Sequence, residues 1–520
     1  MTFCQQCLTL GAVTIRLKPV LQAALFGLAG TALAAPAEKV PLEQRQWFEA
    51  RTAHFHTYSC GAQQEVARLT ARLEQFHAAY AMLAGTQAVS SPPIVVMAFP
   101  DHAALEPFLP VYQGQPANLA AFFHRGSDEN LIALSLSSTG TGALEAVFHE
   151  YAHLLLRHNQ QFWPLWLKEG MADIYSTFEV TGDHSACIGK PMDLYLHLLA
   201  QEQLLPLREL FAVTHDSPAY NERERQGMFY TESWLLTHYL MLGDNPGCRA
   251  RFPQLTLLLR QGQPIQQAFT NTFRTSLPAM EHNLRQYLAR GTFVPLALTV
   301  QANLKGPQAM TTRSLTPVEI RFRLGDQLLR LGRLEEAESY FSRAQKLAPA
   351  SPLPYEGLGL LAAERGQHAE AARCLQDALR RGSASFLAHY IYARARVRLL
   401  NGPGDTYVRL GRADAAEVQR ELQNALALMP DFGPAHYLLG VVELLQGESF
   451  GEAEQHLQRA IQLEPENQGY ALTLAEVQLM KNDLEAARRT LEPLRRPYVE
   501  AGVRIRAEKL LKTVNARAQE

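Results

Sequence analysis

The second half of the chain repeats a pattern of small and apolar residues with a period of 34 residues. Counted from Val318, positions 7, 8, 11, 20, 24 and 27 hold Leu324, Gly325, Leu328, Ala337, Phe341 and Ala344. Counted from Pro352, the same positions hold Leu358, Gly359, Ala362, Ala371, Leu375 and Ala378. A unit of this length that forms two helices cannot bury its apolar face alone. Successive units are therefore expected to stack into an all-α solenoid.

Further units begin near Phe386, with an insertion at residues 401–411, and at Pro434. The pattern resembles the tetratricopeptide repeat (TPR), a helix–turn–helix unit. This resemblance implies a TPR array of about five repeats over residues 318–497, followed by a capping helix in residues 498–520. Such an array usually presents a concave groove to a protein partner or substrate, and the alternative is that it only packs against the first half of the chain. Because repeats contact mainly their neighbours, we expect a fragment ending near Leu315 to fold alone.

Residues 1–34 have the features of a signal peptide. Arg16 and Lys18 precede an apolar stretch at residues 20–33, which is short and rich in alanine and glycine for a membrane span. Ala32-Leu33-Ala34 forms an A-x-A cleavage site. We expect cleavage after Ala34 and export, to the bacterial periplasm or outside the cell. An uncleaved N-terminal anchor is the alternative, and after cleavage no later stretch is apolar for long enough to span a membrane.

Residues 35–291 do not repeat and indicate a separate domain. The pattern predicts strands at residues 54–59, 94–99, 119–124 and 131–136, and a helix at residues 63–83. Helices are expected to dominate residues 143–291, whereas residues 292–317 have no clear period and indicate a linker. The expected fold class is an α+β domain, with a small mixed sheet plus helices, followed by the solenoid.

His149-Glu150-Tyr151-Ala152-His153 is an H-E-x-x-H motif within a helical apolar pattern. On a helix, His149 and His153 lie one turn apart on the same face, where two imidazoles can share one zinc ion. Glu150 is offset by one residue and can act as the base for a zinc-activated water without becoming a ligand. The alternative, a surface helix with two solvated histidines, fits poorly because apolar residues closely surround the pair.

A catalytic zinc site needs a third protein ligand. Pro164 favours the first turn of a second helix, on which Glu169 can face the first helix and Gly170 permits close packing. Asp173 lies one turn beyond Glu169 and can accept the second ring N–H of a zinc-bound histidine. The sequence therefore predicts His149, His153 and Glu169 as zinc ligands. The alternative for Glu169 is an exposed helix carboxylate.

The H-E-Y-A-H helix followed by W-L-K-E-G-M-A-D-I-Y resembles the gluzincin zinc metallopeptidases, most closely the peptidase MA-like family. The resemblance covers roughly residues 51–291 and implies a zincin-like catalytic domain with a thermolysin-like zinc site. Thermolysin-like enzymes carry a Glu-x-x-x-Asp on the second helix, and Glu169 and Asp173 match that spacing. The sequence departs from the pattern in the gap of 15 residues between His153 and Glu169, which is shorter than in thermolysin-like and aminopeptidase families.

Two further expectations come from this resemblance. The segment G-M-F-Y-T-E-S-W resembles one that carries a tyrosine at the start of a helix, which implies that Tyr230 stabilises the oxyanion; the alternative is a core tyrosine. The predicted strand at residues 119–124 precedes another strand and then the zinc helix. In thermolysin-like folds a strand in that order lies at the sheet edge and pairs with the peptide substrate, whereas an ordinary inner strand is an equal alternative here.

Composition limits the other possibilities. The net charge of −2 shows no basic excess, which argues against nucleic acid as a partner. Four cysteines follow the predicted cleavage site without a C-x-x-C pair, namely Cys60, Cys187, Cys248 and Cys374. They allow three disulfide pairings, and four free thiols fit equally well.

The chain is therefore predicted to be an exported zinc-dependent metallopeptidase that hydrolyses peptide bonds, with TPR repeats that recruit a protein partner or substrate. Endopeptidase and exopeptidase action are both open. One alternative is a TPR scaffold protein with an inactive or vestigial peptidase domain. A second is an H-E-x-x-H hydrolase that acts on another kind of bond.

Overall fold

A computed structural model describes residues 40–519 of the 520-residue chain, except for residues 85–93, 113–114, 118, 127, 139–140, 161–162, 215–216, 218–222, 302, 305–308, 402–409, 448, 466 and 497–498. The predicted signal peptide at residues 1–34 lies outside the described residues. In the part of the chain that the structure describes, no helix is both long and apolar enough to cross a membrane.

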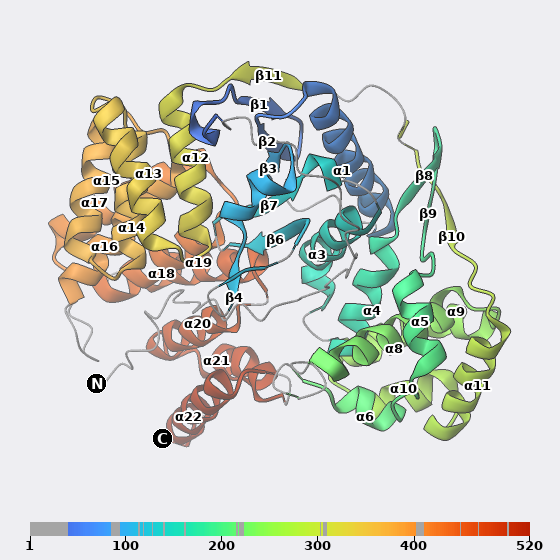
Figure 1. The fold of residues 1–520 in the computed structure, drawn as a ribbon. Coiled ribbons are helices and arrows are strands. Elements are labelled where there is room, and N and C mark those ends of the chain that lie inside the picture. The colour runs from blue at the N-terminus through green and yellow to red at the C-terminus, as the bar shows by residue number, and fades with distance from the viewer. Residues whose placement is uncertain are drawn as a thin grey trace.

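A six-stranded mixed sheet forms the centre of the first half (Figure 1). Its order is β11-β1-β2-β3-β7-β6. The strands are β1 (Phe48–Arg51), β2 (Phe55–Ser59), β3 (Ile94–Phe99), β6 (Ala121–Arg125), β7 (Asn130–Ser135) and β11 (Thr311–Ser314). β2, β3 and β7 run parallel, and the outer pairs are antiparallel. The four strands predicted from the sequence are thus confirmed, with β6 at one edge of the sheet.

The two faces of this sheet belong to different cores. Val96, Ala98 and Ile132 pack into a core with the helices α1 (Gln63–Ala84) and α3 (Thr141–Gln160). The alternate residues Val95 and Met97 pack into a second core with the helices of the repeat array. Every residue of β3 and β7 is buried, as expected for strands that are covered on both faces.

Helices and a small three-stranded sheet make up the second part of this domain. The helices are α4 (Leu165–Ser176), α5 (Asp193–Gln201), α6 (Leu207–Ala212), α8 (Arg223–Leu242), α9 (Pro246–Arg260), α10 (Ile265–Phe273) and α11 (Leu277–Arg290). The sheet contains β8 (Glu179–Gly182), β9 (Ser185–Ile188) and β10 (Leu296–Thr299). Shorter elements are η2 (Leu42–Gln44), α2 (His102–Leu105), η3 (Glu106–Phe108), β4 (Val111–Tyr112), β5 (Gln115–Pro116) and η4 (Leu136–Ser138).

The expectation of a featureless linker at residues 292–317 was wrong in part. This segment contributes β10 to the small sheet and β11 to the edge of the main sheet. Each strand has only four residues, and β11 is exposed throughout, so neither shows a hydrophobic period. The main sheet therefore uses residues on both sides of the helical region.

The second half is a helical array (Figure 1). Its pairs are α12 (Pro317–Arg330) with α13 (Leu334–Leu347), α14 (Leu353–Glu364) with α15 (His368–Arg380), α16 (Phe386–Asn401) with α17 (Arg412–Leu428), α18 (Gly433–Gln446) with α19 (Phe450–Leu463), and α20 (Gln468–Met480) with α21 (Leu484–Leu491). The short helix η5 (Glu492–Arg495) and the closing helix α22 (Ala501–Arg517) follow. Ala337, Ala371 and Ala453, which share one repeat position, are fully buried.

The array packs directly on the sheet, which argues against our expectation that a fragment ending near Leu315 folds alone. Val95, Met97 and Phe99 of β3 share a core with Leu324 and Leu328 of α12. Removing the array would expose this face of the sheet, because α12 and its neighbours cover it. The array is thus part of the tertiary structure of the first half, in addition to any role in binding.

Candidate metal centre

The helix α3 places the two histidines of the H-E-x-x-H motif on one face. Phe148, Tyr151 and Ala152 of the same helix pack into the core of the first domain, which fixes the rotation of the helix. His149 is almost fully buried, and the side chain of His153 is 22% exposed. Their Nε2 atoms lie 3.1 Å apart. The site is therefore accessible to solvent on the side of His153 and buried on the side of His149.

The helix α4 brings Glu169 against this pair. Pro164 occupies the position immediately before the helix, where its missing N–H removes no hydrogen bond. A Cβ atom at Gly170 would lie 2.2 Å from Thr237 Oγ1 and 2.3 Å from the Ser233 carbonyl oxygen of α8. Glycine at this position thus allows α4 to lie close to α8 while Glu169 faces α3.

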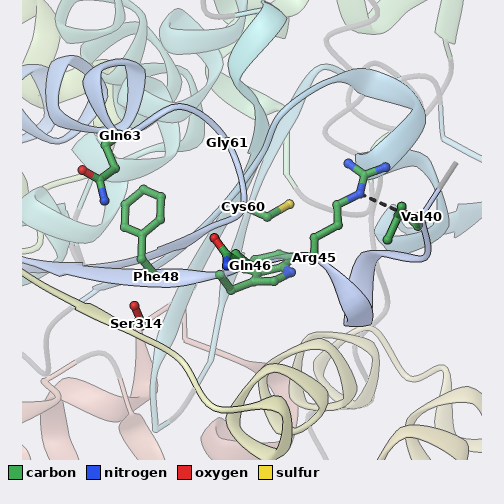
Figure 2. A pocket seen from close by; sticks show the side chains of 9 residues that line it. Val40, Arg45, Gln46, Phe48, Cys60, Gly61, Gln63 and Ser314 are labelled. Carbon is green, nitrogen blue, oxygen red and sulfur yellow. Dashed lines mark hydrogen bonds between the residues drawn. The ribbon is translucent and has the colours of Figure 1, made fainter.

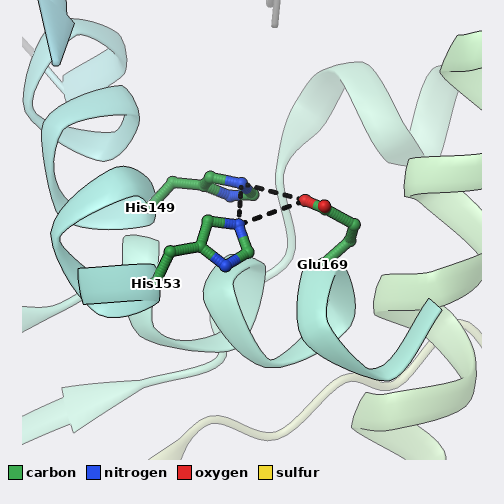
Figure 3. A group of neighbouring side chains, drawn as sticks. All are labelled: His149, His153 and Glu169. Carbon is green, nitrogen blue, oxygen red and sulfur yellow. Dashed lines mark hydrogen bonds and ion pairs between the residues drawn. The ribbon is translucent and has the colours of Figure 1, made fainter. Parts of the chain in front are cut away.

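The three predicted ligands converge on one point (Figure 3). Glu169 Oε2 lies 3.3 Å from His149 Nε2 and 3.2 Å from His153 Nε2. A tetrahedral zinc ion with bonds of about 2.0–2.1 Å requires ligand atoms about 3.3–3.4 Å apart. The three separations match one face of such a tetrahedron to within a few tenths of an ångström. The donor set of two imidazoles and one carboxylate also suits zinc.

Asp173 orients the first histidine from one turn further along α4. His149 Nδ1 donates to Asp173 Oδ1 at 2.8 Å, which leaves Nε2 as the atom that faces Glu169 and His153. The hydroxyl of Tyr195, on α5, donates to the other oxygen of Asp173 at 2.9 Å. Sequence reasoning missed Tyr195, because a tyrosine in a short amphipathic helix carries no motif.

Burial and charge act in opposite directions at these groups. Burial alone would lower the pKa of His149, but the carboxylates of Asp173 and Glu169 raise it well above the usual histidine range. Burial favours a raised pKa at Glu169, yet contacts with His153 and His149 hold that pKa well below its usual range. Burial raises the pKa of Asp173, which its bond with His149 offsets only in part. The pKa of each of these carboxylates and imidazoles thus depends strongly on the charge of the others.

The two predicted catalytic side chains lie beside this group. Glu150 is half-buried on α3, and its charge is among those that raise the pKa of His149. The ring centroid of Tyr230 lies 6.4 Å from that of His149. Tyr230 was expected at the start of its helix, but α8 begins at Arg223, about two turns earlier. The apolar period of α8 begins only near Met228, which explains the misplaced start.

His238, further along α8, does not join the metal centre. Its Nε2 lies 3.0 Å from the Gly189 carbonyl oxygen, and its Nδ1 lies 2.8 Å from the Tyr287 hydroxyl. Burial lowers its pKa to about 4, so it is neutral near pH 7. It is a satisfied core histidine, as its apolar surroundings in the sequence suggest.

The edge strand β6 lies next to α3, the helix that carries His149 and His153. It is the last strand in the sheet order, and α3 packs against it. Its other edge carries no strand partner among the described residues. The strand therefore has the edge position that the resemblance implied, rather than the inner position that was the alternative.

A separate hollow of about 710 Å³ lies at the β1–β11 end of the sheet (Figure 2). It is lined by Val40, Arg45, Gln46, Trp47, Phe48, Cys60, Gly61, Gln63 and Ser314. Burial raises the pKa of the Cys60 thiol, although Arg45 opposes this. Cys60, Cys187, Cys248 and Cys374 are all free thiols in the structure, which agrees with one of the two alternatives.

Comparisons with known proteins identify the repeats. Family models of the tetratricopeptide repeat match residues 318–351, 357–399 and 444–501, so the predicted TPR repeats are confirmed. A search of curated proteins finds no match to the chain. Three of the similar solved structures cover between 36% and 39% of this chain. A thermophilic TPR protein from Thermus thermophilus is 26% identical, with 38% of this chain and 99% of that chain covered and a TM-score of 0.30.

The second structure is PilF from Pseudomonas aeruginosa, which is 18% identical, with 39% and 86% of the two chains covered and a TM-score of 0.31. The third is YrrB, described as a TPR protein with an unusual peptide-binding site, which is 17% identical, with 36% and 91% covered and a TM-score of 0.30.

Proposed function

We propose that the chain is an exported zinc metallopeptidase of the gluzincin type, with a zincin-like catalytic domain and a TPR array. The convergence of His149, His153 and Glu169 at tetrahedral spacing is the observation that carries this proposal. The hydrogen bond that His149 donates to Asp173 supports it, because metal-binding histidines usually donate their second N–H to such a group.

A zinc ion held by these residues would supply Lewis-acid activation of a water molecule and of the scissile carbonyl. Glu150 then accepts the proton of the attacking water and passes it to the leaving amine. Its offset by one residue from His149 keeps it near the site without making it a ligand. Tyr230 donates a hydrogen bond to the oxyanion as it develops. The outer edge of β6, which has no strand partner among the described residues, binds the substrate backbone as an added strand.

The remaining parts of the proposal concern location and partners. Residues 1–34 direct export and are removed, and the mature protein acts in the bacterial periplasm or outside the cell. TPR repeats imply a protein partner, and here they recruit a partner or the protein substrate. Nucleic acid is not expected to bind, because the net charge is −2.

Comparison of the wild type with Glu150→Gln tests the enzyme directly. The two proteins are incubated with casein and with a proteome extract, and new peptide termini are identified by mass spectrometry. Cleavage by the wild type and none by the variant supports the proposal, because the substitution removes only the base. Glu65→Gln, at an exposed position in the first turn of α1, is the matched control and should cleave like the wild type.

A TPR scaffold with an inactive domain is the second candidate, since the repeats are the part of the chain with family matches. A wild type that cleaves no peptide although it holds zinc would favour this candidate. Hydrolysis of ester or amide substrates without peptide cleavage would instead favour an H-E-x-x-H hydrolase of another kind.

A further inference from the structure

Part of the surface of the first repeat, on helix α12, packs against the sheet domain of the first half of the chain and is not exposed to solvent. Asp326 and Gln327 of α12 are buried, and Gln327 Nε2 donates to the Phe108 carbonyl oxygen at 3.1 Å. The guanidinium of Arg323 lies 4.4 Å from the ring centre of Tyr58 on β2. Part of the surface of the first repeat is thus covered by this chain's own sheet domain.

Arg330, the last residue of α12, makes the densest of these contacts. Its Nη1 and Nη2 donate to both carboxylate oxygens of Asp128, at 3.2 and 3.0 Å. Nη2 also lies 3.3 Å from Glu129 Oε2, and Nε donates to Asp326 Oδ2 at 3.1 Å. The side chain of Arg330 is 9% exposed. A bidentate arginine–carboxylate pair of this kind fixes the relative orientation of the two side chains as well as their distance.

The partners of Arg330 belong to the turn that joins β6 to β7. Asp128 and Glu129 lie between the end of β6 and the start of β7. A Cβ at Gly126 would lie 3.3 Å from Arg330 Nη1 and 2.2 Å from the Glu129 carbonyl oxygen, so glycine there allows the guanidinium to sit against the turn. The charge of Arg330 also reaches His124 on β6, whose pKa burial and this arginine lower to about 4.

The same turn joins β6, which packs against the helix α3, to its only strand neighbour among the described residues. β6 has only β7 as a sheet neighbour among the described residues, and α3 packs against it. A strand of five residues held on one side by a single neighbour depends on its turn for its direction. Arg330 therefore links the first repeat to the turn of the strand that packs against α3, the helix of His149 and His153.

We propose that Arg330 is a positioning residue that holds β6 in place for an extended peptide substrate. The first repeat would then contribute directly to substrate binding by the peptidase domain. This inference rests on the proposed function. It also names the substrate class, since β6 pairing requires an unfolded segment of several residues in extended form. A folded protein surface or a dipeptide cannot use the full strand.

The test compares Asp128→Asn and Arg330→Gln with the wild type in the full-length protein. Asp128→Asn is nearly isosteric, leaves α12 unchanged and weakens the bidentate pair with Arg330. Asp377→Asn is the matched control, because Asp377 also pairs with arginines of the array but lies on α15. We would measure hydrogen–deuterium exchange of residues 121–125 and the zinc content of each protein. Steady-state kinetics would give KM and kcat for an octapeptide and for a dipeptide.

The expected result is about 10–100-fold faster exchange in β6, the effect of losing one charge-assisted hydrogen bond on local opening. KM for the octapeptide should rise by a similar factor, while kcat, zinc content and dipeptide cleavage stay unchanged. Unchanged exchange in β6 would overturn the proposal, whether or not the protein cleaves peptides. An equal rise in KM for both substrates would also overturn it, because a purely structural role affects both alike.

Asp128→Asn decides the matter if Arg330→Gln fails to fold. A wild type that holds zinc but cleaves neither peptide contradicts the proposed function instead. In that case the exchange measurement still decides whether Arg330 positions β6.

Discussion

Removal of Asp173 is the sharpest perturbation of the metal centre that leaves its ligands in place. This carboxylate has no exposed surface, and it accepts hydrogen bonds from His149 Nδ1 at 2.8 Å and from the Tyr195 hydroxyl at 2.9 Å. Asp173→Ala deletes both acceptors. The imidazole of His149 then loses the contact that directs its Nε2 toward Glu169 and His153.

The size of the effect follows from these contacts. Loss of such an orienting group typically weakens metal affinity by roughly 10–100-fold. This corresponds to about 1.4–2.7 kcal/mol of binding free energy. Each buried donor that loses its acceptor costs about 1–3 kcal/mol, so the metal-free variant should also melt at a lower temperature. The ligand set itself is unchanged, so zinc should still bind.

Zinc affinity is measured by competition with a chelator of known affinity. Tyr195→Phe is the control, because Tyr195 acts on His149 only through Asp173, and its loss should weaken affinity by less than about tenfold. Affinity of Asp173→Ala within twofold of the wild type would refute the role of Asp173, and so would a larger loss in Tyr195→Phe than in Asp173→Ala.

Three other predictions follow from the structure. Burial raises the pKa of Glu232 from 4.5 to about 8, so the carboxyl group is protonated in the folded protein at a pH where it is ionised in the unfolded chain. The free energy of unfolding therefore falls by about 1.4 kcal/mol for each pH unit as the pH rises from about 5 to 8. Glu232→Gln should therefore gain melting temperature relative to the wild type between pH 5 and 8, and parallel pH profiles would contradict this. A fragment ending at Leu315 should be insoluble, because it exposes the sheet face that α12 covers; a soluble, zinc-binding fragment would show that the array is dispensable. Tyr230→Phe should lower kcat by about 10²–10³-fold with an unchanged melting temperature, and a normal kcat would make Tyr230 a packing residue.

The parts of the fold with strong local patterns could be predicted from the sequence. A period of 34 residues sufficed for the TPR repeats, and continuous apolar runs sufficed for β3 and β7. The helical spacing of His149 and His153 placed them on one face of α3. These signals depend on neighbouring residues alone, so no knowledge of the tertiary structure was needed.

The contacts between distant parts of the chain could not be predicted in this way. β10 and β11 are strands only because β9 and β1 pair with them, and their own residues have no pattern. Tyr195 reaches Asp173 from a different helix. Arg330 and Asp128 are 202 residues apart, and nothing near either one indicates the other. The sequence left packing of the array against the first half of the chain open as an alternative, but it did not indicate which residues form that contact.

Zinc content of the purified protein tests the central claim most directly. The wild type, exposed to zinc and dialysed, should hold about one zinc ion per chain, and Glu150→Gln should hold the same amount. His149→Ala, His153→Ala and Glu169→Ala should each lose most of it. Retention of the full zinc content by any of these three variants, or a wild type that binds none, would contradict the assignment of this site as a zinc centre.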